Sequence, residues 1–214
     1  MLEIKNLSVG NILKGVNLTV PRGARALLSG ANGSGKTTLV NAIIGHPDYK
    51  TSGQIILDGA DISGMATAER MRVGLFVGLQ TVPEIAGLSV MTFLKHSYMA
   101  HFGDVPIGEI TGKLRAAMAR LDIPDSWLAR SINVGFSGGE KKRLMFLHLM
   151  IISPKMAVLD EPDSGADPDT RDLFGQIINE MPGTTFLIIS HQQGWFTPTS
   201  SFEINELANG KNMI

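Results

Sequence analysis

Short hydrophobic runs separated by turns fill the first part of the chain, a pattern that is typical of β-strands. Apolar and polar residues alternate over residues 2–9 and 12–20, with a turn at Gly10-Asn11 between the two runs. Further apolar runs of strand length cover residues 24–29, 53–57 and 75–79. The pattern predicts short antiparallel strands near the N-terminus and a buried strand over residues 24–29.

The middle of the chain has the spacing of helices instead. Apolar residues recur at helical intervals over residues 90–100, 107–121 and 138–152, and we expect no strand among them. Strand and helix patterns then alternate over residues 156–159, 168–181 and 184–190, before a closing strand at 202–207 and a turn at 209–210. Strands that alternate with helices predict a parallel sheet.

These patterns predict a single α/β domain over residues 1–214, with a helical subdomain inserted into it. Residues 1–88 and 154–214 would form the core, a mainly parallel sheet with flanking helices and an N-terminal antiparallel β subdomain. Residues from about 89 to 153 would form the inserted helical subdomain. A chain of this length can bury a substantial hydrophobic core.

The segment that follows the buried strand 24–29 matches the pattern G-x-x-x-x-G-K-[ST] without a mismatch. Its glycines let successive backbone N–H groups point at phosphate oxygens, Lys36 supplies a positive charge, and the Thr37 hydroxyl can ligate Mg²⁺. A helix predicted over residues 36–44 turns its positive end toward the anion. The predicted nucleotide contacts here are Gly30, Asn32, Gly33, Ser34, Gly35, Lys36, Thr37 and Thr38. We therefore expect the core of a P-loop NTPase, with ATP and Mg²⁺ as cofactors.

The apolar strand 156–159 ends in two adjacent carboxylates, Asp160 and Glu161. An acid at the end of a buried strand beside a phosphate loop is suited to hold Mg²⁺, which we expect of Asp160. Glu161 could then act as a general base toward the attacking water. Taken alone, the pair could equally be two solvated acids at a strand end. The phosphate loop makes the catalytic interpretation far stronger.

Ser137 precedes a predicted helix whose first turn contains Gly138 and Gly139. Ser137 is a suitable N-cap, so an ordinary helix start is one explanation. Glycine costs about 1 kcal/mol against alanine inside a helix, however, which favours the close approach of an anion at this position.

The order of these motifs, together with Gln80, Asp167 and His191, resembles the nucleotide-binding domain of the ABC ATPases over nearly the whole chain. The resemblance implies an ATPase in which nucleotide lies between two copies arranged head to tail. It implies that Ser137 and Gly139 reach the nucleotide of the second copy, and that Asp167 contacts that copy. The implied catalytic residues are Glu161, His191, Gln80 and Lys36, and the implied Mg²⁺ ligands are Thr37, Gln80 and Asp160.

Within this family, residues 130–143 and 80–89 are similar to SufC, the ATPase of the SUF iron–sulfur assembly machinery. This resemblance implies a SufB/SufD-like scaffold as partner. The alternative is the ATP-binding subunit of a membrane transporter, and a third possibility is a nucleotide-gated module with little turnover, which Glu161 disfavours. The expected docking surface is an apolar loop that contains Val82, Pro83, Ile85 and Leu88, unless these side chains fold back on the helical subdomain.

The composition of the chain further limits which ligands it can bind and where in the cell it is expected. The net charge of −1 provides no basic footprint for nucleic acid, and the absence of cysteine excludes thiolate-held clusters on this chain. We find neither an apolar leader nor a run long enough to cross a bilayer, which predicts a cytoplasmic protein without direct membrane insertion. No aromatic residue lies between Val9 and Ile12, so adenine is expected to rest on an aliphatic side chain such as Val16.

Overall fold

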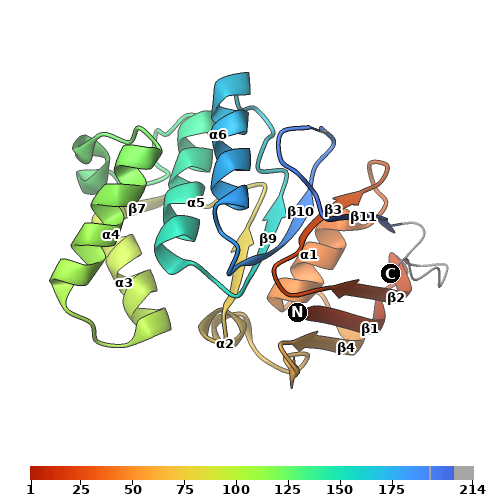
Figure 1. The fold of residues 1–214 in the computed structure, drawn as a ribbon. Helices are drawn as coiled ribbons and strands as arrows, with labels where there is room; N and C mark the ends of the chain where they lie inside the picture. Colours follow the sequence, from red (N-terminus) through yellow and green to blue (C-terminus); the bar gives the residue numbers. More distant parts are fainter. Residues whose placement is uncertain (193, 205–214) are drawn as a thin grey trace.

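A five-stranded parallel sheet forms the centre of the molecule in the computed structural model, which describes residues 1–192 and 194–204 (Figure 1). The strand order is β11-β3-β10-β9-β6, and each adjacent pair is parallel. The strands are β3 (Arg25–Ser29), β6 (Leu75–Gly78), β9 (Met156–Asp160), β10 (Thr185–Ile189) and β11 (Ser200–Glu203). The predicted α/β fold with a parallel sheet is confirmed.

A second, antiparallel sheet lies against the first part of the core. Its order is β2-β1-β4-β5, and all its pairs are antiparallel, as predicted. The strands are β1 (Leu2–Val9), β2 (Leu13–Val20), β4 (Thr51–Leu57) and β5 (Ala60–Asp61). Their buried apolar side chains share one cluster with α1 (Lys36–Ile44) and one face of the parallel sheet. Helix α1 is therefore held between two sheets (Figure 1).

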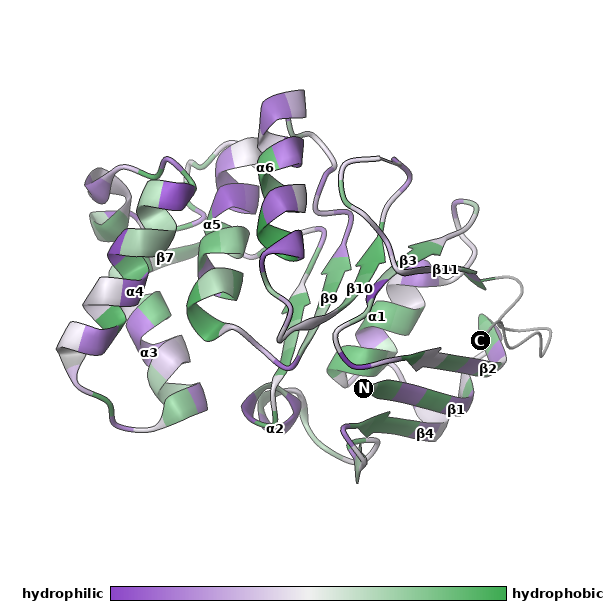
Figure 2. Cartoon of the chain, in the orientation of Figure 1, coloured by the Kyte–Doolittle hydropathy of each residue, from purple (hydrophilic) through white to green (hydrophobic). Residues whose placement is uncertain are grey.

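Five other helices pack on the opposite face of the parallel sheet from α1. This layer consists of α3 (Val90–Phe102), α4 (Ile107–Arg120), the 3₁₀ helix η1 (Asp125–Ala129), α5 (Gly138–Ile152) and α6 (Pro168–Asn179). Successive residues of β9 alternate between the two clusters: Ala157 and Leu159 face the helices, whereas Val158 faces α1. Phe146 and Phe174 stack at 3.8 Å between ring centroids and join α5 to α6. The central strands are green along their length in Figure 2, because both of their faces are covered.

The structure contains a pair of short strands that the sequence pattern did not predict in residues 80–89 and in the helical region. Strand β7 (Ile85–Ser89) replaces part of the predicted loop and pairs with the two-residue strand β8 (Ser131–Ile132), where no strand was predicted. Two residues are too few to produce a periodic pattern, so the sequence could not indicate β8. The closing strand begins at Ser200, and the predicted turn at 209–210 lies outside the described residues.

The buried guanidinium of Arg70, on α2 (Thr67–Arg72), fixes the far end of α1. Arg70 donates to the carbonyl oxygens of Ala42 and Ile43, both at 2.8 Å. It also donates to the carbonyls of Met65 and Ser63. The bonds to Ala42 and Ile43 engage carbonyls in the last turn of α1, where a helix leaves carbonyl groups without intrahelical partners. Arg70 thereby places a positive charge at the negative end of the α1 dipole.

Candidate functional site

The start of α1 is open to an incoming anion. Gly35 occupies the N-cap position with φ 98°, and no side chain of the described residues caps the helix there. The positive φ of Gly35 favours glycine, and a Cβ atom there would lie 2.7 Å from a Leu13 methyl carbon and force that side chain to shift. The first N–H groups of α1 remain free to bind phosphate oxygens.

Lys36 lies inside the phosphate loop. Its ammonium donates to the carbonyl oxygens of Gly30 and Ala31 at 2.8 and 2.9 Å, and the residue is 7% exposed. The buried Ser34 hydroxyl has no hydrogen-bond partner among the described residues. The phosphate loop is thus already folded around the Lys36 ammonium, while the Ser34 hydroxyl remains available to bond a ligand.

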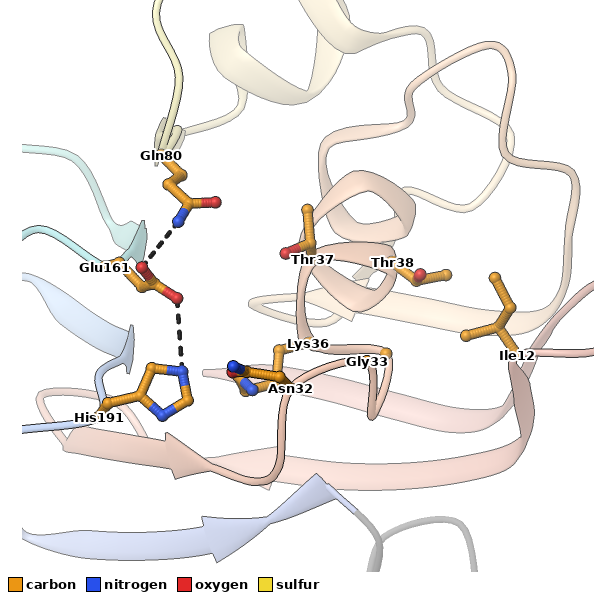
Figure 3. A pocket seen from close by; sticks show the side chains of 10 residues that line it. Ile12, Asn32, Gly33, Lys36, Thr37, Thr38, Gln80, Glu161 and His191 are labelled. Carbon is orange, nitrogen blue, oxygen red and sulfur yellow. Dashed lines mark hydrogen bonds and ion pairs between the residues drawn. The ribbon is translucent and has the colours of Figure 1, made fainter. Parts of the chain in front are cut away.

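A cavity of about 640 Å³ opens in front of the phosphate loop. The loop and the start of α1 form one wall, whereas Gln80, Glu161 and His191 form the other (Figure 3). The lining residues are Ile12, Asn32, Gly33, Gly35, Lys36, Thr37, Thr38, Gln80, Glu161 and His191. The structure therefore brings most of the predicted nucleotide and catalytic residues to one space.

Glu161 is held between two of the predicted catalytic residues. The Gln80 amide donates to one carboxylate oxygen at 2.7 Å, and His191 Nε2 lies 3.5 Å from the other (Figure 3). The backbone of Glu161 has φ 49°, which is unusual for a residue other than glycine. Lys142 Nζ donates to the Glu161 carbonyl at 2.7 Å and helps to hold this conformation. The carboxylate thereby points into the cavity rather than along the strand.

Asp160 is positioned to ligate a cation. The residue is 2% exposed, and its Oδ1 has no hydrogen-bond partner among the described residues. Burial, followed by the nearby Glu161 charge, raises the pKa of Asp160, while a hydrogen bond from Thr37 opposes this shift. A buried carboxylate oxygen beside a threonine hydroxyl offers the hard oxygen ligands that Mg²⁺ prefers. The residues present therefore fit the predicted Mg²⁺ site.

The start of α5 is closed by its own side chains, unlike that of α1. The Ser137 hydroxyl accepts from the Glu140 N–H at 3.2 Å, and the Glu140 carboxylate accepts from the Ser137 N–H at 2.7 Å. The Arg130 guanidinium carbon lies 3.6 Å from the centroid of the Phe136 ring, and the guanidinium donates to the Gly135 carbonyl. These two contacts stabilise the turn that precedes α5.

Ser137 and Gly139 do not line the cavity, and neither does Asp167. Asp167 instead caps α6, where it accepts from the Thr170 N–H at 2.9 Å and from the Thr170 hydroxyl at 2.7 Å. Gly30 and Ser34 of the phosphate loop do not line the cavity either, so five of the predicted nucleotide-binding residues lie outside the lining of one chain's cavity.

Two contacts of the site were not found from the sequence. Ile12, which is 59% exposed, lines the cavity, whereas Val16 is fully buried in the core, so the expected contact between adenine and Val16 is wrong. The approach of Leu13 to Gly35 carries Ile12 to the cavity, and no local pattern indicates this contact. Lys142 was also missed, because the sequence does not distinguish it from its neighbour Lys141, which is only partly buried.

A second, apolar groove of about 200 Å³ runs beside β7. Val82, Pro83 and Ile85 line it, and Ile85 is 42% exposed. Leu88 instead packs against the helical cluster, so part of the predicted docking loop does fold back. His148 also lines the groove, where burial lowers the pKa of its imidazole to about 3 and keeps it neutral.

Comparisons with known proteins agree with this geometry. A family model described as ABC transporter matches residues 13–164. A Streptococcus pyogenes protein named "Probable ABC transporter ATP-binding protein" is 43% identical, over 90% of this chain and 79% of the relative. A Synechocystis protein named "Probable ATP-dependent transporter" is 38% identical, over 99% of this chain and 87% of the relative.

The fold is also similar to that of a solved structure, a bacterial ABC transporter cassette that was determined as a dimer. The TM-score is 0.80, the identity is 18%, and the match covers 95% of each chain. This likeness concerns the fold alone. No helix in the described part of the chain is both long and apolar enough to cross a membrane.

Proposed function

The chain belongs to the ABC transporter family, whose ATP-binding domains use ATP and Mg²⁺. We propose that it is a motor subunit that closes with a second copy of itself over bound nucleotide. The single observation that carries the proposal is the Glu161 carboxylate, which faces the phosphate loop across the cavity between Gln80 and His191. This is the placement that a general base for attacking water requires.

The residues of the chain divide the chemistry between them. Lys36 exchanges its bonds to the Gly30 and Ala31 carbonyls for phosphate oxygens, and the free N–H groups at the start of α1 bind further oxygens. Thr37 and Asp160 would hold Mg²⁺, which when bound neutralises charge on the phosphates.

Glu161 takes a proton from the attacking water while the oxygen of that water bonds to the γ-phosphorus. The bond between the γ-phosphorus and the oxygen that it shares with the β-phosphate breaks, and ADP leaves. Gln80 and His191 hold the carboxylate in place and border the position of the γ-phosphate. We assign Gln80 as a further Mg²⁺ ligand, a role in which its amide oxygen would face the metal.

The second copy would supply the contacts that this cavity lacks. Ser137 and Gly139 lie at an exposed helix start outside the cavity, and the solved cassette with the same fold is a dimer. Asp167, whose carboxylate is engaged by Thr170, would approach the partner copy as a fixed helix cap. We expect the free protein to be monomeric or weakly dimeric and to have low ATPase activity.

The motor acts on a partner, and the apolar groove beside β7 is the proposed docking surface. The names of the relatives favour the membrane component of a transporter as that partner. Residues 130–143 and 80–89 favour a SufB/SufD-like scaffold for iron–sulfur assembly, because they are similar to SufC. The transporter component has the broader support, and the scaffold is the more specific candidate.

Substitution of Glu161 tests the motor. Glu161→Gln should bind ATP normally, lose hydrolysis by about 10²- to 10⁴-fold, the usual contribution of a general base, and accumulate an ATP-bound dimer in size-exclusion chromatography. Hydrolysis at the native rate would contradict the assignment.

Co-purification tests the partner. A polytopic membrane protein recovered in detergent would decide for the transporter, and a soluble scaffold would decide for the SUF-like system. Ile85→Asp should abolish either complex without changing ATP affinity, because Ile85 is exposed and lies outside the nucleotide cavity. Loss of the fold instead would mean that Ile85 is a core residue.

A further inference from the structure

Trp195 follows His191 in the same loop of the chain, bonds the residue that precedes His191, and has its backbone against α6. We propose that Trp195 is a positioning residue, which holds His191 beside Glu161 through a hydrogen bond to Ser190 and a seat on Gly175 of α6. This inference rests on the proposed function, since it assumes that His191 and Glu161 take part in hydrolysis.

The Ser190 hydroxyl joins the two sides of the loop. Ser190 is 3% exposed, and its oxygen accepts from the Gln192 N–H at 3.0 Å and from the Trp195 indole N–H at 3.3 Å. As a donor, the same hydroxyl can bond Asp163 Oδ2 at 2.8 Å or the Gln192 carbonyl at 2.9 Å. Both chain neighbours of His191 are thereby tied to one buried oxygen, so the histidine backbone has little freedom.

Gly175 provides the seat on α6. A Cβ atom at this position would overlap the carbonyl oxygen of Trp195, so the loop backbone rests directly on the helix. The Trp195 side chain is 7% exposed and belongs to the same hydrophobic cluster as Phe174 and Phe196. Its ring lies 4.7 Å from that of Phe196, edge to face. The loop is therefore anchored to a helix that is itself fixed in the core.

This anchoring of the backbone matters because the side chain of His191 is only loosely held. Its side chain is 45% exposed and borders the cavity, and Nε2 lies 3.5 Å from Glu161 Oε1. A shift of the loop backbone would move the imidazole by a similar distance, and a misplacement of about 1 Å can cost up to roughly 100-fold in rate. A buried tryptophan is often only a packing residue, so the experiment must separate positioning from stability.

Trp195→Phe removes the indole N–H and keeps an aromatic ring in the core. We expect kcat for ATP hydrolysis to fall by about tenfold, while the dissociation constant for ATP, measured by calorimetry, stays within about twofold. The decisive measurement repeats the substitution in a His191→Ala background, where Trp195→Phe should cause no further loss. Trp127→Phe, which changes the chain's other tryptophan in η1, is the matched control and should leave kcat unchanged.

Ser190→Ala provides a second variant, because alanine fits the same space and removes the shared hydroxyl. It should show the same dependence on His191, which keeps the proposal testable if Trp195→Phe fails to fold. Additive losses in the His191→Ala background, or native kcat in both variants, would overturn the positioning role while leaving the proposed function intact. If His191→Ala hydrolyses ATP at the native rate, the assignment of His191 fails, and the role of Trp195 fails with it.

Discussion

The two helices that begin near the candidate chemistry, α1 and α5, start in opposite ways. Helix α1 begins at a left-handed glycine, has no acidic residue in its first turn, and is capped by no side chain in the part of the chain that the structure describes. Helix α5 begins with the reciprocal Ser137–Glu140 capping box and carries that carboxylate in its first turn. An uncapped start is stable when a ligand supplies the missing hydrogen bonds, whereas a capped start is complete without one. The difference indicates that affinity for nucleotide resides at α1, and that α5 presents a rigid surface to a second copy.

Among changes at the starts of these two helices, the largest effect should come from the lysine at the start of α1. Lys36→Met removes a charged donor for phosphate, and hydrogen bonds to charged groups are worth about 1.5–3 kcal/mol, so ATP affinity should fall roughly 10- to 100-fold. Lys141→Met is the matched control on α5, because the Lys141 ammonium is bonded to Glu84 at 2.7 Å on the surface. Calorimetric titration with ATP measures both. Equal losses in the two variants would remove the contrast between the helices.

Removing the cap of α5 should affect stability rather than affinity. Ser137→Ala breaks half of the capping box, which costs about 1 kcal/mol, or roughly 2–4 °C in Tm for a domain of this size. The affinity of the isolated chain for ATP should not change, because Ser137 lies outside its cavity. Thermal unfolding with and without ATP tests both statements. A loss of affinity in the monomer would contradict the proposed division of labour.

Gly139→Ala separates the needs of one chain from those of the pair. A Cβ atom at Gly139 meets none of the described residues within 4 Å, so these residues of a single chain give no steric reason for glycine. Alanine should stabilise α5 by up to about 1 kcal/mol and yet weaken ATP-dependent dimerisation. Chemical unfolding and light scattering in a Glu161→Gln background measure the two effects. If dimerisation is unaffected, close approach of a second copy's nucleotide is excluded at this position.

The smallest effect concerns the pH dependence of the α5 cap. The pKa of Glu140 lies below its ordinary value of 4.5, and the main cause is the hydrogen bond that its carboxylate accepts from the Ser137 N–H. A carboxyl with a lowered folded-state pKa stabilises the fold above its unfolded pKa, and this contribution is lost as the pH falls through the folded value. Since Glu140 is partly exposed, Glu140→Gln should cost about 0.5 kcal/mol or less at pH 7. The difference should shrink below pH 4.5 in urea unfolding curves, and a constant difference would show that the charge is irrelevant.

Much of the site could be predicted because its motifs are local. The phosphate loop and the Asp160-Glu161 pair each follow a buried strand, and the edge of a parallel sheet brings such ends together. Gln80 and His191 were identified through resemblance alone, since a glutamine or histidine at a strand end has no chemical signature of its own. The structure adds the reason that they matter together, which is their shared contact with Glu161.

The remaining contacts depend on long-range packing that no local pattern encodes. Ile12 reaches the cavity because β2 packs on Gly35, and Arg70 reaches α1 from 27 and 28 residues away. The same holds for Trp195, whose seat on Gly175 can be recognised only when both backbones are placed.

The position of β3 in the sheet has a consequence for biosynthesis. The strand that leads into the phosphate loop pairs with β10 and β11, so its neighbours lie about 160 to 175 residues later in the chain. An emerging polypeptide can therefore form the loop's sequence early, but it cannot complete the sheet that shapes the loop until residue 203 has left the ribosome. ATP binding would then mark the end of folding rather than assist its beginning, and the cellular nucleotide pool would stabilise finished molecules over nascent ones.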